Sequence, residues 1–559
     1  MANVDSQSQI QDGPSHPSPF TEDRVALEQE ATQMIRGARR KFWKSLFRKK
    51  SKKVPKSSET QENVVGSSTS GSGDTHDQAR PSPSWTNWAK NQSCHPAEII
   101  KPTTLQDLVN IVKRAKTEKR KIRCAGSGHT WSSSSVVDGG FLLDMTLMTK
   151  IFNPVQQTKE DGGGWSVEVE TGVLVKLLDG ALKSHNPPLS LPSNVVLDSV
   201  RYGGILSLGC HGAATHTRTL PDLVTEVKIV DSEGNLNTFS RKKDVAEFKA
   251  ACINLGLFGV IYSYTMHVEP LFKLKMTDTY PLLNEFFSNP KDGGKNLREM
   301  VLKNDQTEIF YWPFNTSGQD AANDHLWIKQ WERTNQPVTE TPEEDNFQKV
   351  IQSLQTKFGN TLYEFMAANP TCTPFMDCLI FSALKRDSER VLWAPEAIHY
   401  QAGIDNIPCL DIEMAFKCDD NFENVVKAWM FVIDLMYQYA KKDQYPFNLT
   451  LEMRFVKSSD ITMSNAYDKD PEAIYCMMEI LSVVNTKGFE EFTSKVALYW
   501  MENFQARPHW AKMWEFIPGI VPYLQKQTGS QLTEFEAIRK KYDPEGMFMN
   551  KTFAPLLGY

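Results

Sequence analysis

A glycine turn at residues 125–130 has the composition of an anion-binding loop. The run reads AGSGHT, and Gly126 and Gly128 can both adopt a positive φ. Consecutive backbone N–H groups can then converge on an anion, which is how a concave backbone nest holds phosphate oxygens. The spacing is not that of a Walker A loop, nor of a G-x-G-x-x-G dinucleotide fingerprint, because Thr130 and Trp131 follow the histidine. On periodicity and spacing alone, an ordinary tight turn is the commoner explanation of such a run.

A second candidate for a functional site is a pair of oppositely charged residues near residue 450. The run LEMRFV places Glu452 and Arg454 two residues apart between apolar neighbours. Because successive side chains of a β-strand point to opposite faces, a strand here would place both charges on one face. A solvent-facing ion pair on a sheet surface would give the same pattern.

The elements that must position these residues begin near Trp85. Thr103 and Gln106 have the spacing of a capping box, and apolar residues follow at helical intervals, at Leu105, Leu108, Val109 and Val112. This pattern predicts a helix over residues 103–117. Apolar runs predict strands, at residues 121–124, 141–145 and 167–169. The glycine turn would therefore follow directly on a strand of a mixed α and β chain.

Composition excludes several classes of protein. A chain of 559 residues that is 40% hydrophobic is expected to form about two to four domains with sizeable cores. Its 62 Lys and Arg against 68 Asp and Glu give a net charge of −6, which offers no global reason to bind nucleic acid. No run approaches the roughly 18 apolar residues that a membrane-spanning helix requires.

Residues 1–84 differ in composition from the rest of the chain. Ten Lys or Arg and no acid lie between Arg36 and Lys53, interleaved with aromatic and apolar residues. A basic amphipathic helix within residues 21–53 could bind an anionic membrane surface or a calmodulin-like partner. A disordered extension with a chance cluster of charge fits as well. Residues 57–84, rich in Ser, Thr, Gly and Pro, are expected to be a disordered linker.

The cysteines and the N-terminal residues give an expectation for the cellular compartment of the protein. Nine cysteines without a C-x-x-C pair do not suit a disulfide framework or a zinc site, so we predict a reducing environment and no metal. The first residues also lack the apolar core of a secretory signal. We therefore expect an intracellular, cytoplasmic protein. Peripheral attachment to a membrane, mitochondrial or other, through the basic segment is the alternative.

Several segments, in order, resemble one family of flavoenzymes. They are WTNWAKNQSCHPAEIIKP, AGSGHTWSSSS, RYGGILSLGCHGAATHTRTLPDLVTEV, HWAK and DPEGMFMN. Together they are similar to the sugar-lactone and alditol oxidases of the vanillyl-alcohol oxidase superfamily, which include D-arabinono-1,4-lactone oxidase and L-gulonolactone oxidase. The resemblance covers residues 85–559.

The resemblance implies an α+β flavoprotein of two domains. A PCMH-type FAD-binding domain would occupy residues 85–275, and an α+β cap domain that binds substrate would occupy residues 276–500. Residues 501–559 would return to complete the FAD domain and the active site. The extension of residues 1–84 lies outside the resemblance.

The resemblance also implies which residues bind FAD. They are Gly126, Ser127, Gly128, His129, Thr130, Gly204, Ser207, Gly209, Cys210, His211, Gly212, Gly259, Val260 and Ile261. His129 matches the residue that in many members bonds covalently to the 8α carbon of the flavin, and non-covalent FAD is the alternative. Cys210 stands where the family commonly has Thr or Ala, which leaves open whether oxygen reoxidises the flavin. The run at 256–261 is also explained as a buried strand with glycine kinks.

The implied catalytic residues are Glu452, Arg454, Lys512 and His509. Glu452 would accept a hydrogen bond from a substrate hydroxyl, and Arg454 would stabilise negative charge on the substrate or the reduced flavin. Lys512, in the HWAK run, would lie near the N1 edge of the flavin, where charge accumulates when hydride reaches N5. His509 would donate to the substrate or only pack within its motif.

The implied reaction is FAD-dependent oxidation of a CH–OH group of a polyol or an aldono-1,4-lactone, with oxygen or another compound as the electron acceptor. A lactone would give a 2-ketolactone that enolises to an ascorbate-type acid. Two alternatives stay open at this point. The same scaffold could oxidise another alcohol or a specialised metabolite, or the chain could be an inactive flavin-fold protein that binds a membrane or a partner.

Overall fold

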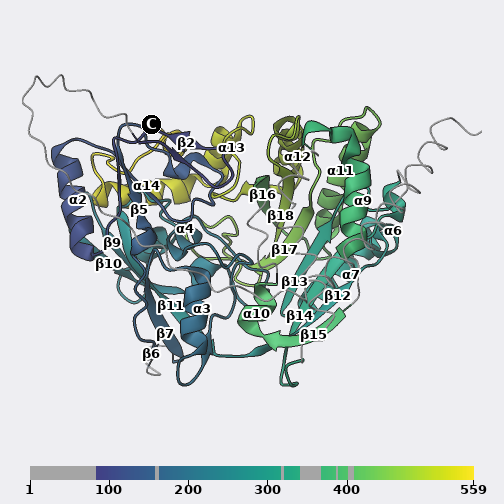
Figure 1. Ribbon diagram of the computed structural model, residues 1–559, viewed down its shortest axis with the longest axis horizontal. Helices are drawn as coiled ribbons and strands as arrows, with labels where there is room; N and C mark the ends of the chain where they lie inside the picture. Colours follow the sequence, from purple (N-terminus) through teal and green to yellow (C-terminus); the bar gives the residue numbers. More distant parts are fainter. Residues whose placement is uncertain (1–82, 158–162, 317–319, 340–366, 385–387, 401–407) are drawn as a thin grey trace, which may run out of the picture. The chain divides into compact units, whose positions relative to one another are not determined.

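The described part of the chain mixes helices with sheets, and its first strand begins at Trp85 (Figure 1). The computed structural model describes residues 83–157, 163–316, 320–339, 367–384, 388–400 and 408–559. The predicted amphipathic segment of residues 21–53 therefore lies outside the described residues. So does the predicted linker, apart from its last two positions.

Helix α2 (Leu105–Thr117) confirms the predicted helix but not its predicted cap. Thr104 is the N-cap, and its hydroxyl accepts a hydrogen bond from the backbone N–H of Asp107 at 3.1 Å. The Asp107 carboxylate in turn accepts from the N–H of Thr104 at 2.9 Å. The prediction of Thr103 with Gln106 was wrong by one residue. A carboxylate accepts a backbone N–H better than an amide does, and the Gln106 amide instead donates to Asn110.

The first half of the described chain contains two main sheets and several short helices. A parallel three-stranded sheet has the order β3 (Glu98–Ile100), β5 (Phe141–Asp144), β4 (Ile122–Ala125). An antiparallel sheet contains β10 (Leu236–Ser240), β9 (Val224–Val230), β11 (Val260–Pro270), β7 (Trp165–Glu170), β6 (Val155–Gln156) and, on β11, β8 (Leu189–Ser190). Also present are β1 (Trp85–Thr86), β2 (Ser93–Cys94), α3 (Val175–Lys183), α4 (Tyr202–Ser207) and α5 (Val245–Cys252). The three predicted strands correspond to β4, β5 and β7.

The second half is built on an antiparallel sheet of eight strands, drawn mainly in green in Figure 1. Its order is β15 (Ser388–Trp393), β12 (Lys273–Thr279), β14 (Trp327–Thr334), β13 (Gln306–Tyr311), β17 (Leu451–Lys457), β18 (Ile474–Val483), β16 (Cys409–Lys417), β19 (Arg507–Pro508). The helices of this half are α6 (Leu283–Phe286), α7 (Pro290–Lys303), α9 (Thr373–Leu384), α10 (Ala394–Ile398), α11 (Glu423–Ala440) and α12 (Phe489–Phe504). The predicted domain boundaries stay a prediction.

The two faces of strands β16, β17 and β18 differ in chemistry. Met414, Met453 and Met478 are aligned across the three strands and are fully buried in the main apolar core. Helices α11 and α12 contribute Trp429 and Trp500 to the same core. The residues next to these methionines point to the opposite face, and several of them are acidic or basic. The apolar core therefore fixes the register that aligns the charged residues.

The C-terminal segment returns to the first half. Helices α13 (Ile520–Gln527) and α14 (Gly529–Tyr542) precede a turn in which the Asp543 carboxylate accepts from the N–H groups of Met547 and Phe548 at 2.6 and 2.9 Å. The N–H of Ile122 donates to the carbonyl of Met547 at 3.1 Å. Figure 1 shows the yellow helix α14 among the blue elements of the first half. The last strand before these helices, β19, pairs with β16, so the same segment reaches both halves.

All nine cysteines are free thiols. Within the part of the chain that the structure describes, helices that could cross a membrane, being both long and apolar enough, are absent.

Candidate active site

A glycine-lined cavity lies beside the turn at residues 125–130. The space in it that a water-sized molecule can occupy is about 90 Å³, and the volume reaches about 760 Å³ only when space open to solvent is included. Among the residues predicted to bind the cofactor, those that line it are Gly126, Gly128, Thr130, Gly204, Ser207, Gly259 and Ile261. These come from three separate segments of the chain, which is the convergence that the sequence predicts. The four glycines among them have no side chains, so backbone groups form part of the cavity surface.

The cavity wall tests whether an elongated polar cofactor would fit. A Cβ atom on Gly204 would meet no heavy atom within 4 Å, so no contact within the described residues requires glycine there. Gly128 has φ +73° and is close to the backbone of Trp88. Within the described residues, the buried hydroxyl of Ser134 lines the cavity and has no hydrogen-bond partner. A buried polar atom without a partner is costly. An open backbone surface and a spare polar group both suit a phosphate-containing ligand.

The remaining residues of the AGSGH turn are held by neighbouring loops. The Ser127 hydroxyl donates to the carbonyl of Ser199 at 2.9 Å, so this hydroxyl serves the protein, and only its backbone N–H could face an anion. The His129 ring stacks on Trp88 with centroids 4.6 Å apart. The N–H of Trp88 donates to the carbonyl of Gly128 at 2.8 Å. The segment WTNWAK thus fixes the backbone and the histidine of the turn.

The second predicted loop follows helix α4 and brings His211 into the interior. Gly209 has φ +76°, which lets the chain reverse before Cys210. Burial raises the pKa of the Cys210 thiol to about 12, so this thiol is neutral. Gly212 has no room for a side chain, because a Cβ atom there would lie 2.3 Å from the Ser193 hydroxyl.

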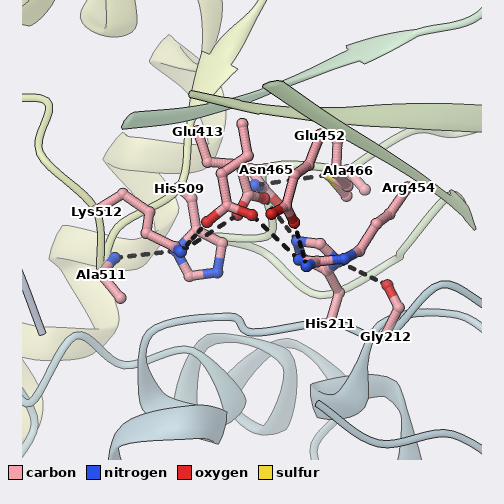
Figure 2. Close-up of polar contacts among 12 residues, drawn as sticks. His211, Gly212, Glu413, Glu452, Arg454, Asn465, Ala466, His509, Ala511 and Lys512 are labelled. Atoms are coloured by element: carbon pink, nitrogen blue, oxygen red, sulfur yellow. Dashed lines mark hydrogen bonds and ion pairs between the residues drawn. The ribbon is translucent and has the colours of Figure 1, made fainter. Parts of the chain in front are cut away.

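His211 forms a buried ion pair with Glu413 of strand β16 (Figure 2). The two atoms, His211 Nε2 and Glu413 Oε1, are 2.6 Å apart, and His211 Nδ1 lies 2.8 Å from the Gly212 carbonyl. Both ring nitrogens of His211 thus have a partner within the protein, one a carboxylate and the other a backbone carbonyl. Burial alone would raise the pKa of Glu413, but the charge and hydrogen bond of His211 hold it well below its usual range.

Arg454 lies among three carboxylates on the charged face of the sheet. Its guanidinium is 2.7 Å from Glu452, 3.2 Å from Glu479 and 3.4 Å from Glu308. Strands β17, β18 and β13 supply these acids, because Glu479 and Glu452 are cross-strand partners and Glu308 is the partner of Arg454. Burial raises the pKa of Glu452 to about 7 against the lowering effect of Arg454, and Glu479 adds to the rise. A carboxyl of this pKa can exchange a proton near neutral pH.

Lys512 occupies a second set of three carboxylates. Its ammonium contacts Asp411 and Glu479 and is 3.9 Å from Glu413. It also lies 4.5 Å from the centre of the Trp131 ring. Burial, reinforced by the nearby charge of Glu479, raises the pKa of Asp411 well above its usual range. Asp411 is therefore the neutral member of this set.

The two motif loops are joined through their backbones. The N–H of Trp131 donates to the carbonyl of Ala511 at 2.7 Å, and the Ser132 hydroxyl donates to the carbonyl of Trp510 at 2.8 Å. The loop that begins with the glycine turn therefore positions the loop that carries Lys512.

His509 is buried in the same cluster but is neutral. Burial lowers its pKa to about 4. Its Nδ1 accepts from the N–H of Ala511 at 3.1 Å, so the ring proton must lie on Nε2, which can act only as a donor. Ligand atoms of His211, Glu413 and His509 all lie within 4.8 Å of one another. Both ring nitrogens of His211 and Nδ1 of His509 already have hydrogen-bond partners within the protein, so binding a metal ion here would break hydrogen bonds of this cluster.

The catalytic residues implied by the sequence, Glu452, Arg454, His509 and Lys512, are thus brought into one buried cluster, although their roles stay predictions. Sequence reasoning missed the acids that surround them, which are Glu308, Asp411, Glu413 and Glu479. The signal that could have found them is an acid within an apolar strand, as in CLDIEMAF and YCMMEIL. A buried strand rarely carries a carboxylate that has no partner.

Comparison with known proteins agrees with this geometry. Residues 96–240 match the model of an FAD binding domain, and residues 264–555, more than half of the chain, match the model of D-arabinono-1,4-lactone oxidase. The chain belongs to this oxidase family. FAD is its cofactor, and it is an oxidoreductase of the aldonolactone oxidase and dehydrogenase group.

Relatives of this family align along most of the chain. The L-gulono-1,4-lactone dehydrogenase of Mycobacterium tuberculosis is 24% identical over 85% of this chain and 100% of its own length. The L-gulonolactone oxidase of Bos taurus is 23% identical over 83% of this chain and 96% of its own length. A crystal structure of cholesterol oxidase from B. sterolicum has 19% identity and a TM-score of 0.71, covering 85% of this chain and 96% of that one. The fold is accordingly the two-domain FAD-binding fold with a mixed α and β cap.

Proposed function

We propose that this chain oxidises an aldono-1,4-lactone of the D-arabinono-1,4-lactone type, with oxygen as the acceptor and hydrogen peroxide as the product. The observation that supports it is the buried cluster in which Arg454 and Lys512 face the loop that carries His211. When bound, FAD supplies the acceptor for the two electrons of the substrate C–H bond. Residues of this chain would bind the cofactor, orient the substrate and accept its proton.

The cofactor would be held by the backbone of the cavity. Gly126 and Gly128 would offer N–H groups to phosphate oxygens, and Gly204, where a Cβ atom would meet no heavy atom within 4 Å, would allow close approach of a flat ring. The spare Ser134 hydroxyl would gain the hydrogen-bond partner that it lacks among the described residues.

The substrate would be oriented by the charged cluster. Glu452, with a pKa of about 7, would accept the hydrogen bond and then the proton of the reacting hydroxyl. Arg454 and Lys512, whose side chains are 17% and 14% exposed, would stabilise the negative charge that develops beside buried carboxylates. His509 would present its Nε2–H group as a further donor.

The proposal is tested by mixing the anaerobic holoenzyme with aldono-1,4-lactones and following the loss of visible flavin absorbance. D-arabinono-1,4-lactone should bleach the enzyme, and admission of oxygen should restore the colour with one peroxide formed per turnover. Lys512→Met should slow the bleaching about 10²- to 10³-fold, the usual cost of losing one stabilising donor. Lys457→Met, which removes an exposed ion pair with Glu472, is the matched control and should leave the rate unchanged. Bleaching by no lactone, or equal losses in both variants, would contradict the proposal.

A dehydrogenase is the second candidate, because relatives of both kinds align along the chain. In that case lactone would still bleach the flavin, but oxygen would restore the colour slowly and an artificial electron acceptor would restore it fast. Cys210, at the position where the family commonly has Thr or Ala, is the residue to exchange. Cys210→Ala should change the rate of reoxidation and leave the rate of bleaching unaltered.

We propose His129 as the point of covalent attachment to the cofactor. Its ring, stacked on Trp88, lies on the turn that would bind the phosphates. A neutral imidazole nitrogen is a suitable nucleophile, and the linkage would prevent the cofactor from dissociating. Colour should then remain in acid-precipitated, washed protein and be released by His129→Ala. A colourless pellet from the unmodified chain would show that the FAD is bound non-covalently.

The N-terminal segment is proposed to serve in localisation. Its ten cations between Arg36 and Lys53 would attach an intracellular enzyme to the anionic face of a membrane. A calmodulin-like partner is the other reading of the same composition.

A further inference from the structure

Three acidic side chains lie next to one another on the charged face of the eight-stranded sheet. Glu479, near the middle of β18, is the cross-strand partner of Glu413 on β16 and of Glu452 on β17. All three are buried. Like charges directly opposite each other in a sheet are destabilising, so this row of acids needs a counterbalancing arrangement.

The counterbalance is a pair of cations that share one acid. Glu479 Oε2 lies 3.2 Å from Arg454 Nη1, and the other oxygen, Oε1, contacts Lys512 Nζ. Of these two cations, Glu308 and Glu452 contact only Arg454, whereas Asp411 and Glu413 contact only Lys512. Among the ion pairs of the described residues, Glu479 is thus the one carboxylate common to both cations.

A shared carboxylate fixes the two cations relative to each other. Arg454 is carried by a central strand, and Lys512 by a loop that follows β19 at the edge of the sheet. Without Glu479 the side chains of Arg454 and Lys512 would be held by separate sets of acids. In a buried site such charge-assisted contacts are screened little by solvent, so they constrain position strongly.

We propose that Glu479 is a positioning residue that couples Arg454 to Lys512, so that the two cations act on the ligand as one unit. This inference rests on the proposed function only in assigning both cations to the side that faces substrate and flavin. Two further observations support it. Asp411 donates a hydrogen bond to Glu479, and the two cations hold the pKa of Glu479 below its usual range although burial would raise it. Glu479 therefore stays charged between them.

The test uses sulfite, an anion that adds to oxidised flavin and bleaches it without any alcohol substrate. Sulfite affinity of the holoenzyme is measured for Arg454→Met, Lys512→Met and the double variant, first in the wild-type chain and then with Glu479→Gln. Removing one cation leaves Glu479 paired with the other cation. In the wild-type chain, the loss of sulfite affinity in the double variant should therefore differ from the product of the two single losses by about fivefold or more, as for other directly connected groups. In the Glu479→Gln chain, the loss in the double variant should equal that product to within about twofold.

Matched controls are the acids that touch one cation only. Glu308→Gln and Asp411→Asn should leave the coupling between Arg454 and Lys512 as large as in the wild-type chain. A coupling that survives Glu479→Gln, or that Glu308→Gln and Asp411→Asn abolish equally, would overturn the proposal. The wild-type cycle needs no change at Glu479, so additive losses there would overturn it even where Glu479→Gln fails to fold. Because sulfite needs no lactone, these results stand whether or not a lactone proves to be the substrate.

Discussion

At the scale of single residues, the site depends on charges that cannot be removed one at a time. Arg454 and Lys512 are each surrounded by carboxylates in a region with little water. Breaking a buried ion pair by removing one partner typically costs about 3–5 kcal/mol, because the other charge is left uncompensated. A neutral isostere of a carboxylate, which keeps its volume, is therefore a more informative substitution than alanine.

The pKa of Glu452 predicts the pH dependence of the reaction. If Glu452 accepts the hydroxyl proton, only its ionised form is active, so the rate of flavin reduction should rise with pH and reach half its maximum near pH 7. Glu452→Gln should be slow at every pH. The charged and titratable groups that face this carboxyl are Arg454, Glu479, Glu308, Tyr400 and Cys409.

Changes to these neighbours should move the midpoint in opposite directions. Glu479→Gln removes a negative charge that raises the pKa of Glu452, so the midpoint should fall. Arg454→Met removes a positive charge that lowers this pKa, so the midpoint should rise. Stopped-flow reduction across pH 5 to about 9 would measure both. A midpoint that moves in the same direction in the two variants would contradict the assignment of this pH dependence to Glu452.

At the scale of elements, alternation along a strand was enough to predict that Glu452 and Arg454 share a face. The capping box of α2 shows the limit of such local patterns, because Thr103 with Gln106 and Thr104 with Asp107 both have the required spacing. The acids Asp411 and Glu479 lie outside any local motif. Their roles depend on the order β17, β18, β16, which brings three strands of distant sequence together. The spatial order of these strands cannot be predicted from a single sequence.

The basic segment of residues 21–53 gives a prediction of its own at this scale. If it is an amphipathic helix with a cationic end, the full chain should float with vesicles that contain about 30% phosphatidylserine and not with neutral vesicles, since each basic residue near the surface adds roughly 1 kcal/mol. A chain that lacks residues 1–84 should stay with the protein fraction in both. Equal flotation of the two chains would exclude this segment as the anchor, and calcium-dependent capture by calmodulin would favour the other reading.

At the scale of the whole molecule, Arg123 joins segments that lie far apart in the sequence. Its buried guanidinium donates to the carbonyls of Ser134, Gly256, Phe548 and Leu255, at 2.6, 2.8, 2.8 and 2.9 Å. Burial lowers its pKa to about 10, and it stays charged at neutral pH. The resemblance predicted that the C-terminal segment returns to the first half, but sequence alone did not reveal the arginine that holds it there.

Replacement of this arginine should loosen the fold and the cofactor cavity together. Arg123→Met removes this donor from the carbonyls of Gly256, Phe548 and Leu255, while the Ser134 carbonyl keeps Asn550, and we expect a loss of about 2–4 kcal/mol in the free energy of unfolding. The cavity is lined by Arg123 and by all four of these partners, so weaker FAD binding should accompany the lower melting temperature. Arg120→Met, at an exposed position nearby, is the control and should change stability by a few tenths of a kcal/mol. Unchanged melting of the Arg123 variant would disprove this role.

The backbone link between Trp131 and Ala511 also sets an order of events during synthesis. On the ribosome, the strands that carry Glu308, Asp411, Glu413 and Glu479 are all translated before Lys512. Until the lysine arrives, Asp411 lacks its cationic partner, and Glu479 has only Arg454. The acidic face of the nascent sheet should therefore stay hydrated. Closure of that face waits for the lysine loop to dock against a segment made some 380 residues earlier.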